Sequence, residues 1–268
     1  MTAIHIDTDN GLGSPRGDVD DGFAIAAMLA GQFSIAGITS VSGNTSSQLS
    51  YQNCVALARE FSYPGPVILG ESSAKSNSAA EVINGYQEPI NLLALGPLSN
   101  IAECLSANIS NITLVGGNFT SKGRWPPLYP FEYNLTFDRQ ATYRVLTSDI
   151  PITIVPLDVA GRFRFTFHDL EQIPGKIGEF IRGRSKRWYR RALYLKWHRT
   201  VPIWDLLAAI SLLKRDVVTF KSAFVKCHHS GWLEFSPAPK TNFRPVKVVV
   251  DFQKEAAWQH FLQLMASC

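Results

Sequence analysis

The chain has 268 residues, 46% of them hydrophobic and 18% charged, and a formal net charge of +4. This composition is typical of a globular protein with a sizeable core, built as one α/β domain or as two smaller ones. No run of about 18 apolar residues occurs, which argues against a membrane span, and the first residues lack the basic and long apolar stretches of a signal peptide.

The amino-terminal half alternates short apolar runs with segments of helical character. Strands are expected at residues 3–6, 34–43, 66–70, 91–96, 111–117 and 151–159. Helices are expected at 21–31, 45–61, 97–107 and 136–148. This alternation is typical of βαβ units in a parallel sheet, and continuously apolar runs are typical of strands covered on both faces.

The carboxyl-terminal half adds an expected helix at 201–214 and a late strand at 246–252. There is no Pro-, Gly- or Ser-rich linker, internal repeat or low-complexity tract. We therefore expect one α/β domain over residues 1–268, with a single open, mostly parallel sheet and helices on both faces.

Segment 182–199 is rich in Lys and Arg and contains no acidic residue. Such a segment can contact nucleic acid or anionic lipid. The favoured interpretation is a solvated amphipathic helix whose Trp188, Leu195 and Trp197 pack inward. Neither a membrane nor nucleic acid is expected as a partner.

The four cysteines are scattered, and no CxxC pair occurs. A disulfide framework or a zinc knuckle is therefore not expected, and a reducing cytoplasm fits best.

Polar residues follow the apolar runs repeatedly, and five aspartates lie within fifteen residues near the amino terminus. In open α/β sheets, ligands bind outside the carboxyl ends of the strands. The residues expected at that edge are Asp7, Asp9, Asp18, Asp20, Asp21, Asn44, Gly116, Gly117, Asn118, Glu132, Asn134 and Asp205. Oxygen ligands without Cys or His suit Ca²⁺ or Mg²⁺ rather than zinc, and a cation would relieve repulsion between converging carboxylates.

A structural interpretation competes at each of these positions. Asp20 and Asp21 can simply complement a helix N-terminus, worth about 0.5–2 kcal/mol. Asn44 alone is more often a turn residue, and Gly116-Gly117 alone a tight turn. The placement of all of them at strand ends favours a functional site.

Several motifs together resemble the inosine-uridine-preferring nucleoside hydrolases. DTDNG…DVDDGFAIAAML is similar to that family's aspartate motif, which is usually a compact DxDPGxDDAxA. The likeness continues, in the family's order, through VSGN, LALGPLSNIA, LVGG, FEYN, VPLDVA and PIWDLLAAI, and covers most of residues 4–210.

The resemblance implies calcium-dependent hydrolysis of the N-glycosidic bond of ribonucleosides. It implies that Asp9 is the general base and also touches the metal, and that Asp21 and Asp205 bind the metal with the main-chain carbonyl of Leu114. It further implies ribose-binding roles for Asp20, Asn44, Glu132 and Asn134. We expect a homodimer or a homotetramer.

The chain departs from the family pattern in three places. About six extra residues, LGSPRG, split the aspartate motif; they are expected to form a surface excursion anchored by Pro15 and Gly17, although Arg16 or Asp18 could reach substrate.

Trp204 stands where many members have a histidine that could protonate the leaving base. Its indole can stack on a nucleobase, which favours purine nucleosides.

The third departure lies between residues 70 and 134. The segment from residue 70 to residue 90 has fewer residues than the family usually shows, and the Gly-Asn that often precedes the acidic residue is not evident before Glu132. Arg124 and Lys122 lie near that place, so a 5′-phosphorylated substrate is a minor alternative. Other candidate proton donors are the side chains of Tyr189, Lys196 and His198, each of which also has a structural interpretation.

Two other functions compete with nucleoside hydrolysis. One is a Mg²⁺-dependent phosphohydrolase of the DxD type, with Asp7 as nucleophile and Asp9 as metal ligand; the Thr/Ser and Lys expected at later strand ends are not evident. The other is a non-catalytic nucleoside- or nucleic-acid-binding protein that uses the basic segment.

Overall fold

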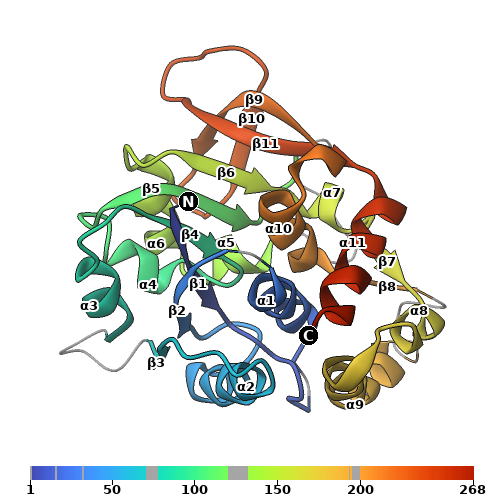
Figure 1. The fold of residues 1–268 in the computed structure, drawn as a ribbon. Coiled ribbons are helices and arrows are strands. Elements are labelled where there is room, and N and C mark those ends of the chain that lie inside the picture. The colour runs from blue at the N-terminus through green and yellow to red at the C-terminus, as the bar shows by residue number, and fades with distance from the viewer. Residues whose placement is uncertain are drawn as a thin grey trace.

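The computed structural model describes residues 2–15, 17–31, 33–70, 78–119, 132–192, 194 and 200–268. Within them a nine-stranded sheet runs in the order β10-β9-β11-β6-β5-β4-β1-β2-β3, with helices around it (Figure 1). Its strands are β1 (Ala3–Thr8), β2 (Ile35–Ser40), β3 (Val67–Leu69), β4 (Ile90–Ala94), β5 (Ile109–Val115), β6 (Ile152–Val155), β9 (Val218–Cys227), β10 (Leu233–Ser236) and β11 (Arg244–Phe252).

The sheet is mostly parallel, as the alternating sequence pattern predicts. All pairs from β3 across to β11 are parallel. Only the pairs that β9 makes with β11 and β10 are antiparallel. A second, two-stranded sheet pairs β7 (Arg164–Phe165) with β8 (Val201–Pro202).

Helices cover both faces of the sheet. They are α1 (Asp20–Ala30), α2 (Ser47–Glu60), α3 (Ser78–Asn84), α4 (Ser99–Ala102), α5 (Tyr133–Phe137), α6 (Arg139–Thr147), α7 (Leu157–Ala160), α8 (Phe167–Glu171), α9 (Gly175–Ala192), α10 (Trp204–Leu213) and α11 (Lys254–Ala266). Successive side chains of a strand point to opposite faces. Leu93 accordingly packs in a hydrophobic cluster with α1, α2 and α10, while Leu92 packs in a second cluster with α3, α4 and α6.

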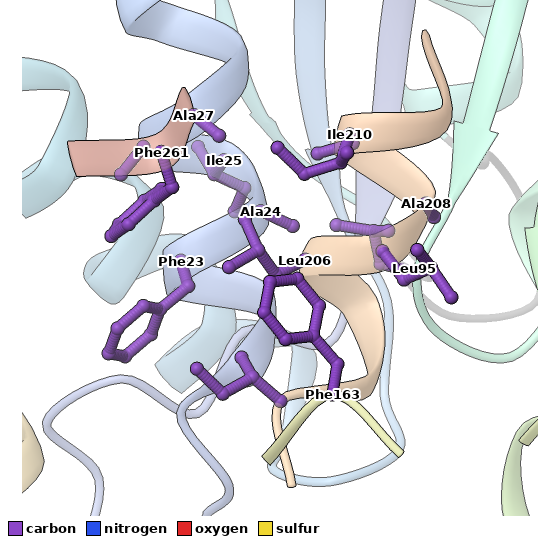
Figure 2. Close-up of a cluster of buried hydrophobic side chains, with 14 of the residues drawn as sticks. Phe23, Ala24, Ile25, Ala27, Leu95, Phe163, Leu206, Ala208, Ile210 and Phe261 are labelled. Atoms are coloured by element: carbon purple, nitrogen blue, oxygen red, sulfur yellow. The ribbon is translucent and has the colours of Figure 1, made fainter. Parts of the chain in front are cut away.

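The contact between α1 and α10 determines where the site lies. Ala24 of α1 is fully buried and faces the same core as Leu206 of α10 and Phe163 (Figure 2). Small side chains at a helix contact allow the two axes to approach closely. The amino-terminal turns of the two helices therefore meet at the edge where the parallel strands end.

The LGSPRG insertion is only in part the surface excursion that the sequence predicts, because Gly13 and Pro15 are exposed but its first residue is not. Leu12 is 1% exposed and belongs to the hydrophobic core. A Cβ atom placed on Gly22 of α1 would lie 2.6 Å from Leu12 Cδ2, so the leucine packs directly on the helix. The insertion thus begins inside the protein, with Pro15 exposed and Gly17 buried; Arg16 lies outside the described residues.

Residues 182–192 of the basic segment form the end of α9, and Trp188 is buried in the core as the amphipathic pattern predicts. Leu195 and Trp197 lie outside the described residues. Within the described part of the chain, no helix is both long enough and apolar enough to span a bilayer.

Candidate active site

Three aspartates converge at the amino-terminal ends of α1 and α10. Asp20 and Asp21 are in the first turn of α1, and Asp205 is in the first turn of α10. One carboxylate oxygen from each lies within 4.8 Å of the other two. All three side chains are buried, with residue exposures of 6%, 2% and 4%. We refer to these three residues as the acidic cluster.

The electrostatics of the acidic cluster favour a bound cation. Burial raises the pKa of Asp20, Asp21 and Asp205 well above the usual range, and the charges of neighbouring aspartates raise each pKa further. Like charges this close cannot all be ionised in a poorly hydrated site unless a positive charge is present. The ligand set consists of hard oxygen atoms, which suits a divalent ion such as Ca²⁺ or Mg²⁺. The residues present therefore fit a metal ion.

Asp9 directly follows β1 and lies beside the acidic cluster. Its Oδ2 accepts a 2.5 Å hydrogen bond from the main-chain N–H of Asn44, and its carboxyl group also hydrogen-bonds with that of Asp21. Burial raises the pKa of Asp9 to about 6, although the Asn44 N–H opposes this shift. At neutral pH the carboxyl group of Asp9 is therefore mostly ionised and can accept a proton.

The close approach around Asp9 requires a glycine. A Cβ atom on Gly43 would lie 2.1 Å from Asp9 Oδ2, which is far inside van der Waals contact. The absence of a side chain at Gly43 therefore allows the loop after β2 to bring the Asn44 N–H onto the carboxylate.

Asp7 lies within the sheet beneath this site. It is completely buried, and its Oδ1 accepts hydrogen bonds from Thr39 Oγ1 at 2.5 Å and from Asn100 Nδ2 at 2.8 Å. This carboxylate links β1, β2 and α4. Its surroundings are those of a structural residue rather than of the nucleophile that a phosphohydrolase would need.

The side chain of Asn44 is bonded to the end of the insertion. Its Oδ1 accepts from the main-chain N–H of Asp18 at 2.8 Å, and its Nδ2 donates to the carbonyl of Asp18 at 3.3 Å. The Asp18 carboxylate in turn accepts a 2.5 Å hydrogen bond from Trp188 Nε1 of α9. The sequence alone does not reveal this connection.

Glu132 is the N-cap residue of α5 (Tyr133–Phe137), and Asn134 lies in the first turn of that helix, beside the ends of β4 and β5. The Glu132 carboxylate caps α5 by accepting from the main-chain N–H groups of Asn134 and Leu135 at 2.9 and 2.5 Å. Burial raises the pKa of Glu132 to about 8, while these two hydrogen bonds lower it. Asn134 Nδ2 donates to the carbonyls of Leu95 and Val115 at 2.8 and 3.3 Å. Both side chains therefore also hold the backbone that surrounds the site.

Leu114 and Trp204 are two further residues to which the sequence assigns a role. Leu114 is buried in β5, one residue before that strand ends. Trp204 is the first residue of α10, directly before Asp205, and is partly buried against the hydrophobic core.

Among the proposed proton donors, Tyr189 packs its ring against Phe165 and Phe167, with centroids 6.2 and 5.3 Å away, as a core aromatic residue does. Lys196 and His198 lie outside the described residues, as do Lys122 and Arg124.

Tyr133 is a site neighbour that the sequence reasoning missed. Its hydroxyl donates to the carbonyl of Gly43 at 2.8 Å, and its side chain is half exposed. Burial raises the pKa of Tyr133, and the charges of Asp9 and Asp18 raise it further, which places the ring near both carboxylates. Its position between Glu132 and Asn134 was the available signal.

The same fold occurs in solved nucleoside hydrolases. A plant nucleoside hydrolase superposes with a TM-score of 0.83 at 19% identity and 98% coverage of both chains. The inosine-uridine preferring nucleoside hydrolase of Bacillus anthracis superposes with a TM-score of 0.79 at 17% identity and 100% coverage of both. At these identities the likeness establishes the fold.

The sequence relatives are named as enzymes that hydrolyse nucleosides. Uridine nucleosidase 1 of Arabidopsis thaliana is 26% identical over 277 residues, which cover 84% of this chain and 78% of the relative. The non-specific ribonucleoside hydrolase RihC of Salmonella paratyphi A is 28% identical over 278 residues, which cover 86% of each.

These solved structures share the mostly parallel sheet, and in this chain an acidic cluster lies at the carboxyl edge of that sheet. Together with the named sequence relatives, this indicates a glycosidase of the nucleoside hydrolase class. The model of the inosine-uridine preferring nucleoside hydrolases matches residues 4–259. The chain belongs to that family, and its activity is hydrolysis of the N-glycosidic bond of ribonucleosides. This assignment takes the place of the phosphohydrolase and non-catalytic alternatives.

Proposed function

We propose that this enzyme is a calcium-dependent ribonucleoside hydrolase that prefers purine nucleosides and releases the free base and ribose. The observation that carries the proposal is the convergence of Asp20, Asp21 and Asp205 within 4.8 Å, beside Asp9. The carboxylates of the acidic cluster, which could bind a metal ion, and the carboxylate of Asp9, which could accept a proton, thus lie together at one edge of the sheet.

Asp21 and Asp205 would hold Ca²⁺ together with Asp9 and the main-chain carbonyl of Leu114. Asp20, which was expected only to bind ribose, also lies in the acidic cluster and is a further candidate ligand. When bound, Ca²⁺ lowers the pKa of a coordinated water and can hold sugar hydroxyls.

Asp9 would act as the general base. Cleavage of an N-glycosidic bond passes through a sugar with oxocarbenium character, so nearby carboxylates stabilise the positive charge that develops on the ring. As the bond from C1′ to the base nitrogen breaks, a water molecule adds to C1′ and Asp9 accepts its proton. The Asn44 N–H on Asp9 Oδ2 fixes the direction of the other carboxylate oxygen.

The sugar would be held by Asp20, Asn44, Glu132 and Asn134. Each carboxylate oxygen has more than one lone pair, so Glu132 can cap α5 and still accept a sugar hydroxyl. The hydrogen bonds of Glu132 and Asn134 to the main chain keep both side chains in place before substrate arrives, which lowers the entropic cost of orienting it.

Trp204 supports the purine preference. An indole offers a large flat surface for stacking, and a purine provides more ring area than a pyrimidine does. A tryptophan cannot deliver a catalytic proton, so the leaving base would take its proton from another group or from water.

The setting of the enzyme is also part of the proposal. All four cysteines are free thiols, which fits a reducing cytoplasm, and a role in purine salvage would follow from the substrate. We propose a single domain over residues 1–268 that assembles as a homodimer or a homotetramer; light scattering coupled to gel filtration measures the assembly.

Ribose release tests the proposed activity. The purified protein is incubated with inosine, adenosine, guanosine, uridine or cytidine in buffer containing Ca²⁺, and reducing sugar is measured. We expect turnover of several ribonucleosides, with higher kcat/KM for the purines. If Ca²⁺ has no effect on the rates, the metal dependence is wrong, and equal rates on all five would contradict the base preference.

A further inference from the structure

The insertion that splits the aspartate motif is connected to the catalytic edge by a chain of hydrogen bonds. Trp188 Nε1 donates to the Asp18 carboxylate at 2.5 Å. The main chain of Asp18 holds both polar atoms of the Asn44 side chain, at 2.8 and 3.3 Å. The Asn44 N–H then donates to Asp9 Oδ2 at 2.5 Å. The chain therefore runs from α9 to the proposed base in three links.

The two ends of this chain are buried, while Asp18 and Asn44 between them are partly exposed. Trp188 is 6% exposed and packs in the core, and Asp9 is 2% exposed. The first and last links both end on a carboxylate oxygen, which can accept a hydrogen bond whether or not the group is ionised.

The insertion is further fixed at its other end. Leu12 is buried against α1, and Ser14 Oγ accepts from Asn53 Nδ2 of α2 at 3.0 Å. Gly11 and Gly17 lie so close that a Cβ on either would be 2.8 Å from the Cα of the other. The approach of Gly11 to Gly17 closes the base of the loop directly beside Asp18.

We propose that Asp18 and Trp188 are positioning residues for the hydrolysis reaction, which act by fixing Asn44 and, through it, the carboxylate of Asp9. The inference rests on the proposed role of Asp9 as general base. It gives the insertion a function, and it gives the buried tryptophan of the basic helix a role beyond packing. In this arrangement the main chain of Asn44 orients Asp9, and the hydrogen bonds to Asp18 hold the Asn44 side chain in place.

Three variants test the hydrogen bonds separately. Asp18→Ala removes the acceptor, Asp18→Asn keeps an acceptor oxygen but no charge, and Trp188→Phe removes the N–H while keeping an aromatic ring. We expect kcat on the best ribonucleoside to fall about tenfold in Asp18→Ala and Trp188→Phe, because small displacements of a catalytic group cost rate steeply. Asp18→Asn should keep kcat within about threefold of the wild type, since the link needs an acceptor rather than a charge.

The double variant Asp18→Ala/Trp188→Phe decides whether the two residues act as one unit. Residues that act through a shared hydrogen bond are non-additive, so its kcat should match that of either single variant. Ser14→Ala is the matched control, because Ser14 lies in the same loop and contacts α2 rather than Asn44. It should change Tm at most and leave kcat and KM at wild-type values.

The outcomes separate this inference from the proposed function. If the wild type releases ribose and Asp18→Ala and Trp188→Phe lose only Tm, the two residues are structural and the inference is wrong. It is also overturned if Asp18→Asn is as slow as Asp18→Ala, because the charge would then act on the site directly. If the wild type releases no ribose from any ribonucleoside, the proposed function fails first, and the positioning role fails with it.

Discussion

The main-chain N–H of Asn44 donates a 2.5 Å hydrogen bond to Oδ2 of Asp9, and Gly43 makes this approach possible. The contact joins the loop after β2 to the end of β1. It orients the carboxylate that we propose as the general base, and it opposes the rise in the pKa of Asp9 that burial causes.

The first prediction concerns Gly43→Ala. The new Cβ would lie 2.1 Å from Asp9 Oδ2, so the carboxylate or the loop must move. We expect kcat/KM for ribonucleosides to fall about a hundredfold, while circular dichroism shows a folded protein. Gly183→Ala is the control: its Cβ meets nothing within 4 Å, and alanine in a helix interior should stabilise the protein by about 0.5–1 kcal/mol without loss of activity.

The second prediction concerns Trp204. If its indole stacks on the base, Trp204→Ala should lower kcat/KM for inosine and guanosine more than for uridine, because the purine loses more stacking area. Trp204→Phe should restore part of the purine rate. Equal losses for purines and pyrimidines would show that Trp204 does not determine base preference.

The third prediction concerns the stability of the metal-free protein as the pH changes. The folded-state pKa of Glu132 is raised by burial from 4.5 to about 8, so between these values the native state binds more protons than the unfolded state. Its contribution to stability is therefore present at low pH and is lost as the pH rises through 8. In EDTA, Tm should decline from pH 5 to pH 8, and the decline should be shallower in Glu132→Gln.

Calcium supplies the companion measurement to that pH series. A cation in the acidic cluster favours the ionised carboxylates. Saturating Ca²⁺ should therefore raise Tm most at pH 8, where protonation of these carboxyl groups is least favourable. A stabilisation by Ca²⁺ that is the same at pH 5 and pH 8 would contradict this linkage.

The fourth prediction concerns acid denaturation. His5 is fully buried between Tyr86 and Thr39, whose hydroxyl oxygens lie 3.0 Å from its two ring nitrogens. Burial lowers the pKa of His5 from 6.5 to about 3, so below pH 6.5 the unfolded state binds the extra proton. Stability should therefore fall by up to about 1.4 kcal/mol per pH unit as the pH drops from 6.5 towards 3. His5→Gln should show a shallower acid limb in urea titrations, although it is less stable at pH 7.

The parallel part of the sheet was predictable because its signal is local. A strand covered on both faces reads as a mainly apolar run, and β4 (INLLA) and β6 (ITIV) show such runs. β9 was missed because it forms the antiparallel margin of the sheet and mixes exposed residues such as Lys221 with buried ones such as Ala223. Its partner β10 is only four residues long. The helix α11 was missed as well.

The carboxylates that converge at the edge of the sheet were predictable from the sequence, and the bonds between them and their neighbours were less so. Strand ends and motif order pointed to Asp9, Asp21 and Asp205, because parallel strands bring such residues to one edge. The grouping of Asp20 with Asp21 and Asp205 depends on the close packing of α1 on α10, which no local pattern encodes. The bond between Asp18 and Trp188 joins residues 170 positions apart, and a lone leucine in a loop gave no sign that Leu12 is buried.

The central claim is that the acidic cluster binds the divalent ion on which hydrolysis depends, and calorimetric titration of Ca²⁺ into EDTA-stripped protein tests it most directly. The account predicts one Ca²⁺ per chain for the wild type and a loss of at least tenfold in affinity for Asp205→Asn, which keeps the shape of the side chain but removes its charge. No saturable binding by the wild type, or equal affinity in Asp205→Asn, would contradict it.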